Sequence, residues 1–140
     1  GKDIVNASDE VISGKFDDIY NQTKIAEENG LLLIAGPGYR KALEFLVKDY
    51  LIKSDPGIEN EVKKKTLGDA IKLIEDRRIE ACASRAAWLG NDETHYVRKW
   101  EDKDLQDLKN LIRMVVDWID LVERSKEYEK VMPSPETPAE

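Results

Sequence analysis

The sequence contains little of the chemistry on which metal sites and disulfide frameworks depend. Cys82 is the only cysteine and His95 the only histidine among 140 residues. Closed zinc sites usually take four ligands rich in cysteine and histidine, so we predict no metal site, although Asp92 and Glu93 lie close to the histidine. A single cysteine excludes an intramolecular disulfide and is typical of a reducing compartment. We therefore expect a cytoplasmic protein with no metal and no cofactor, in which Cys82 is a core residue.

Long hydrophobic runs are also missing. The longest one covers residues 31–35, whereas a helix needs about 20 apolar residues to cross a bilayer. The N-terminal residues lack the basic and then apolar order of a signal peptide. We therefore predict no association with a membrane. The first residue is Gly1 rather than methionine, as expected of a chain cut from a longer protein.

Positive charge is in deficit. The chain has 22 lysines and arginines against 29 acidic residues, which gives a net charge of −7 and a pI near 4.9. A protein that binds nucleic acid nonspecifically gains affinity by replacing counterions with lysine and arginine, so this balance argues against such binding over the whole surface. A local basic groove stays compatible with the sequence, because residues 61–90 are mildly basic.

Helical periodicity runs through nearly the whole chain, and no segment alternates apolar and polar residues for long enough to predict a strand. The apolar content of 41% suits one core, so we predict a single all-α domain over residues 1–132, built as a bundle of about five helices. Residues 133–140 hold three of the five prolines and are predicted to be a disordered tail. We found no heptad pattern long enough to predict a coiled coil.

Turn and capping residues predict where the helices begin and end. Gly36, Pro37 and Gly38 are expected to kink or break the second helix, which then becomes strong near Gly38. The expected order is a first helix to residue 29 with Phe16, Tyr20 and Ile25 on its apolar stripe, a second over 31–52, a mobile connector over 54–65, a third capped by Thr66, a fourth from 76 to 89 ended by Gly90, and a fifth capped by Asp102.

Two segments carry a resemblance to a known family. Residues 39–48 read YRKALEFLVK on one predicted helix, and residues 89–96 read LGNDETHY before a closing amphipathic helix. In this order the segments resemble the DUF4145 domain, which is grouped with the HEPN-like all-α superfamily. The resemblance covers roughly residues 10–125 and implies a HEPN-like helical bundle.

The resemblance also implies a biological setting. Members of the family occur as stand-alone bacterial or phage proteins and as domains attached to restriction and other defence enzymes. Our leading hypothesis is a non-catalytic interaction or dimerisation module of a prokaryotic or phage defence system or a nucleic-acid-processing system. Its partner is then a second copy of the chain or another protein.

An endoribonuclease is the first alternative, because HEPN relatives that cut RNA without a metal use an Arg-x4-6-His motif. This sequence departs from that motif, since nine residues separate Arg85 from His95, and the residue with three between is Asn91. Cleavage needs a base for the ribose hydroxyl and a cation for the charged phosphate. In this hypothesis His95 is the base, Asn91 donates a hydrogen bond, Glu44 orients the imidazole and Arg40 supplies the charge.

Two further readings concern the arginines. Arg40 and Glu44 are spaced i, i+4, so they are also predicted to form a surface ion pair on their helix. In the second functional alternative, Arg40, Arg85 and His95 form an anion pocket for a nucleotide or the end of a nucleic acid.

Overall fold

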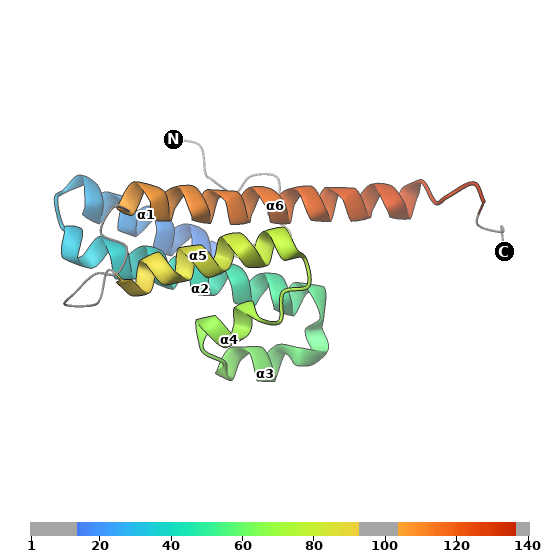
Figure 1. Cartoon of the computed structure of the whole chain (residues 1–140), viewed down its shortest axis with the longest axis horizontal. Coiled ribbons are helices and arrows are strands. Elements are labelled where there is room, and N and C mark those ends of the chain that lie inside the picture. The colour runs from blue at the N-terminus through green and yellow to red at the C-terminus, as the bar shows by residue number, and fades with distance from the viewer. Residues whose placement is uncertain (1–13, 93–103, 137–140) are drawn as a thin grey trace.

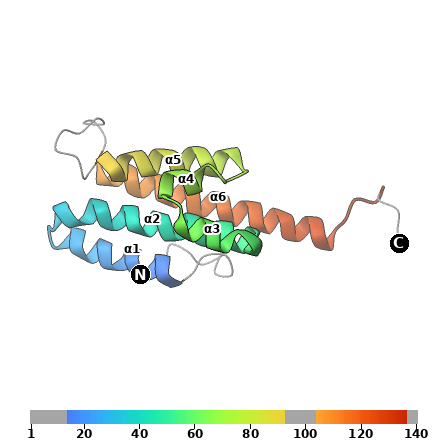
Figure 2. The same ribbon diagram turned by 90° about the horizontal axis from the view of Figure 1, so that it is seen from below.

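The computed structural model describes residues 14–92 and 104–136, and every regular element in these ranges is helical. The prediction of an all-α bundle is confirmed. Figures 1 and 2 show the longer helices lying roughly along one axis, with two short helices to one side. The elements are α1 (Gly14–Glu28), α2 (Leu32–Ser54), the 3₁₀ turn η1 (Pro56–Ile58), α3 (Glu59–Lys64), α4 (Leu67–Ile71), α5 (Arg77–Asp92) and α6 (Leu105–Val131).

Helices α1 and α2 form an antiparallel hairpin. The predicted stop after residue 29 is confirmed, because Gly30 has a φ of +77°, which favours glycine. Phe16 and Tyr20 are buried against the rest of the core, as their spacing predicts. Ile25 was expected on the same apolar stripe, but it is exposed, because it lies near the end of α1 where no element covers it.

Helix α2 does not break at its proline. It runs from Leu32 through Pro37 to Ser54, so the predicted break before Gly38 is wrong, whereas a kink at this point stays a prediction. Proline removes the backbone hydrogen bond to the carbonyl four residues earlier, which belongs to Leu33. Leu33 is almost fully exposed, and water can therefore satisfy that carbonyl.

The segment after α2 is structured, and the prediction of a mobile connector over residues 54–65 is wrong. Asp55 caps the turn η1 through a hydrogen bond from the Gly57 amide, and α3 follows directly. Val62 of α3 is fully buried. Lys48 of α2 donates a hydrogen bond to the Lys65 carbonyl at 2.6 Å. One buried valine and this lysine thus attach the connector to α2.

Side-chain caps begin the helices of the second half of the chain. Thr66 accepts a hydrogen bond from the Asp69 amide at 3.1 Å, as predicted for the start of α4. Helix α6 is capped by Asp104, which forms a reciprocal capping box with Asp107. The prediction of Asp102 as this cap is wrong, because the capping geometry lies two residues later.

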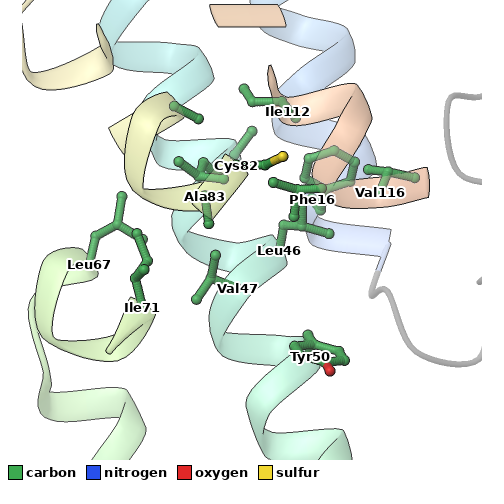
Figure 3. Packing of buried hydrophobic residues seen from close by; sticks show 14 of the residues in the cluster. Phe16, Leu46, Val47, Tyr50, Leu67, Ile71, Cys82, Ala83, Ile112 and Val116 are labelled. Carbon is green, nitrogen blue, oxygen red and sulfur yellow. The ribbon is translucent and has the colours of Figure 1, made fainter. Parts of the chain in front are cut away.

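The core lies between α1, α2, α5 and α6, and α2 packs against every other helix. Figure 3 shows Cys82 of α5 among core side chains such as Phe16 and Ile112, and burial raises the pKa of its thiol. Beyond this core, α6 continues as a free helix whose residues 124–132 are all exposed. Residues 133–136 continue the chain without helical structure, whereas the rest of the predicted tail lies outside the described residues.

Candidate interaction site

Two of the residues proposed for catalysis, Arg40 and Asn91, lie toward the end of the bundle where α5 stops. His95 belongs to residues 93–103, which lie outside the described residues. Asn91 is exposed on the last turn of α5. Glu44 forms an ion pair with Lys48 at 2.9 Å, and no ion pair joins it to Arg40, so the predicted pair between Arg40 and Glu44 is wrong. Lys48 lies one turn after Glu44 on α2 and forms the ion pair in place of Arg40. The same lysine donates to the Lys65 carbonyl of the connector.

Arg40 of α2 lies directly against Gly90 of α5. A Cβ built on Gly90 would lie 2.8 Å from the Cβ of Arg40 and 3.0 Å from its Cγ. The prediction that Gly90 ends its helix is wrong, since α5 continues to Asp92 and Gly90 is buried within it. The glycine allows the two helices to approach closely. Arg40 and Gly90 thus bring into contact the two segments, residues 39–48 and 89–96, on which the family resemblance rests.

The Arg40 guanidinium is only partly satisfied. Its Nε atom is buried and has no hydrogen-bond partner in the described part of the chain. A buried donor without a partner costs about 1–3 kcal/mol. The Arg40 side chain therefore contributes to helix packing through its aliphatic contact with Gly90, while its Nε–H group is left without a hydrogen bond.

Arg85 lies in a different environment from Arg40. It lines a mainly apolar groove of about 430 Å³ between α5 and α6, together with Trp88 and Met114. Its guanidinium carbon is 5.2 Å from the centre of the Trp88 ring, and its Nη1 donates to the Ala81 carbonyl at 3.1 Å. Because Arg40 meets α5 from α2 and Arg85 faces α6, the described residues do not bring the two arginines of the predicted anion pocket together.

A polar network joins α1, α2 and α6 beside a second cleft. The Tyr39 hydroxyl donates to Glu27 Oε1 at 2.6 Å, and Lys109 Nζ lies 3.0 Å from the same oxygen. Burial opposes ionisation of Glu27, but the hydrogen bonds from Tyr39 and Lys109 outweigh burial and lower its pKa. Burial and the bond to Glu27 raise the pKa of Tyr39. The network joins three helices. Its main acceptor, Glu27, and its cation, Lys109, are already paired with each other.

The largest group of exposed aliphatic side chains covers the turn between α1 and α2. We call it the hairpin end and define it as Ile25 with residues 31–34. All five side chains are at least half exposed, and Leu33 is 94% exposed. This turn lies at one extremity of the long axis in Figures 1 and 2. Residues 29–39 contain no charged side chain, although charged residues make up 36% of the chain.

The sequence predicts the second helix from residue 31 with a stripe that passes through Ala35, Tyr39, Leu43 and Leu46, and it assigns no surface role to residues 31–34. The stripe itself is confirmed from Ala35 onward, since Tyr39, Leu43 and Leu46 are buried. Residues 31–34 precede the point at which α5 and α6 cover α2. The absence of charge over 29–39 was the available signal, because a buried helix normally keeps polar residues on its outer face.

The described residues hold no group of three or more histidine, cysteine, aspartate or glutamate side chains arranged to bind a metal ion. Within the same ranges, no helix is both long and apolar enough to cross a bilayer. Comparisons with protein-family models, with curated proteins and with solved structures found no match for this chain.

Proposed function

We propose that this chain is a non-catalytic, HEPN-like interaction module that self-associates through the hairpin end, in a prokaryotic or phage defence or nucleic-acid-processing system. The observation that carries the self-association is the exposure of five aliphatic side chains around an uncharged turn. The wider setting rests on the resemblance of residues 39–48 and 89–96 to the DUF4145 domain.

A second copy of the chain is the occupant that suits this surface. Apart from the hairpin end, the molecule carries a net charge of −7 distributed over a charged surface, and two such surfaces repel each other. An uncharged apolar patch complements a copy of itself about a two-fold axis without opposing like charges. The turn between α1 and α2 reaches further along the long axis than the nearby ends of α5 and α6, so a second copy has access to it.

The exposed area is sufficient for a weak dimer. Burying a leucine or isoleucine completely contributes at least about 1.5 kcal/mol, so two sets of half-exposed or more exposed side chains supply roughly 10 kcal/mol. Association costs at least about 4 kcal/mol in lost translational and rotational freedom. At this lower limit of the cost, about 6 kcal/mol remains, so tens of micromolar is the tightest dissociation constant that the patch supports.

Sedimentation velocity over a range of concentrations tests the proposal. Leu33→Asp places a charge on the side chain that is 94% exposed, so it disrupts the patch without entering the core. Asn60→Asp is the matched control, because it adds the same charge at an exposed position on α3. We expect the wild type and Asn60→Asp to associate to the same degree and Leu33→Asp to associate clearly less. A monomeric wild type, or equal association of the two variants, would refute the proposal.

A further inference from the structure

A second apolar surface follows the outer side of α6. Three of its exposed large apolar side chains belong to Met114, Leu121 and Tyr128, and they are between 44% and 66% exposed. They are seven residues apart, and Met132 follows Tyr128 directly after the end of the helix. Trp118 and Ser125 fall between the three, so residues 114–128 have the alternating spacing of four and three residues that a coiled coil requires. We call this set the outer seam.

Apart from Trp118, which packs partly against the core, the outer seam is distinct from the face that α6 buries in the bundle. Leu108, Ile112, Val115 and Ile119 form the inner face and are fully buried. Helix α5 covers the side of α6 only as far as Trp118, over whose ring Arg78 lies at 4.5 Å. Beyond that point the helix continues to Val131 with every residue from 124 onward exposed. The seam therefore extends past the bundle, where another helix has access to it (Figure 1).

We infer that the outer seam pairs with the same seam of a second copy, as a parallel two-stranded coiled coil that forms an interface separate from the hairpin end. Charge complementarity favours this occupant and this direction. Arg124 directly precedes Ser125 and Glu129 directly follows Tyr128, so both flank the seam. The Nε atom of Arg124 lies 3.1 Å from Asp120 of the same helix, and the side chain is still 64% exposed, so its remaining N–H groups can reach a partner. In a parallel coiled coil, the residue at the position of Arg124 lies opposite the residue five positions later on the partner helix. Arg124 thus meets Glu129 of the other copy, and symmetry forms the pair twice.

Parallel pairing in register also places Ser125 opposite its own copy at the centre of the seam. This residue is small and exposed, so a cysteine at this position is accommodated and can form a disulfide between copies. Lys130 lies five residues later on another side of the same free helix and is equally exposed. A cysteine there reports only random collisions. The buried Cys82 is present in both variants and contributes equally to each.

The experiment compares Ser125→Cys with Lys130→Cys, each in the full chain carrying Leu33→Asp, which removes association through the hairpin end. After mild oxidation, non-reducing electrophoresis measures the disulfide-linked fraction. We expect several-fold more linked dimer for Ser125→Cys than for Lys130→Cys. Equal linkage in the two variants, or no linkage of Ser125→Cys, overturns the inference.

A charge exchange supplies a second readout. Arg124→Glu alone opposes two negative side chains and is expected to weaken association in sedimentation velocity, whereas Arg124→Glu combined with Glu129→Arg restores it. Failure of the double variant to recover argues against parallel pairing in this register. Since these experiments use the Leu33→Asp background, their outcome does not depend on whether the hairpin end self-associates.

Discussion

The close approach of Arg40 and Gly90 predicts the effect of a single methyl group. In Gly90→Ala, the new Cβ would lie 2.8 Å from the Cβ of Arg40, which is fixed to the backbone of α2 and cannot rotate away. Overpacking of this kind costs about 1–3 kcal/mol. Alanine recovers about 1 kcal/mol of helix propensity relative to glycine. We expect a net loss in the free energy of unfolding of about 1 kcal/mol, measured by urea denaturation followed by circular dichroism.

Gly68→Ala is the matched control, because Gly68 lies in α4 and a Cβ at this position would meet nothing within 4 Å. It is expected to stabilise the protein by up to about 1 kcal/mol through propensity alone. A double-mutant cycle then locates the clash. Arg40→Gly relieves the cost of Gly90→Ala, whereas Arg40→Ala retains the 2.8 Å contact and relieves little. If Gly90→Ala is as stabilising as Gly68→Ala, the argument for close helix packing is refuted.

Three further predictions concern stability and reactivity. Although burial opposes ionisation of Glu27, bonds from Tyr39 and Lys109 lower its pKa, so its contribution to stability is present above its ordinary pKa of about 4.3 and is lost as the pH falls through the lowered value. Glu27→Gln should therefore be about 1–2 kcal/mol less stable than wild type at pH 7, and this difference should shrink as the pH falls below about 4.3 in urea titrations, whereas a constant difference at all pH values would contradict this. Thr66→Ala removes the cap of α4 and should cost about 1 kcal/mol in the same assay, so an unchanged midpoint would argue against the cap. Cys82 is buried and its thiol pKa is raised, so it should react with a thiol reagent only after unfolding, and rapid reaction of the native protein would contradict its burial.

The fold was largely predictable because helices with one covered face leave a clear periodicity. The spacing of Leu43, Leu46 and Val47 predicts their burial, and all three are buried in the structure. Local rules failed where a distant neighbour decides the outcome. Pro37 is tolerated within α2 because the carbonyl that it frees lies on an exposed turn. Gly90 lies within its helix and not at the helix end, because its missing side chain serves the close approach of Arg40 from α2.

The candidate site was less predictable than the fold. Arg40 and Asn91 were identified as parts of one region, and both lie toward the end of the bundle where α5 stops. The hairpin end was missed, because a leucine at the start of a helical stripe reads as core until its neighbours are known. The outer seam of α6 was missed for a related reason. The stronger periodicity of Ile112 and Val115 on the inner face obscures a second repeat on the same helix.

The position of α2 among the other helices sets the order in which the molecule can open. Each other helix packs against α2, so displacement of α2 uncovers most of the core, while α5 keeps its contacts with α4 and α6. The amides of α2 are therefore expected to exchange with solvent only at a free energy close to that of global unfolding. The last turns of α6 depend on no other helix and exchange by fraying. The molecule thus combines one cooperative unit with a helical extension that melts and reforms on its own.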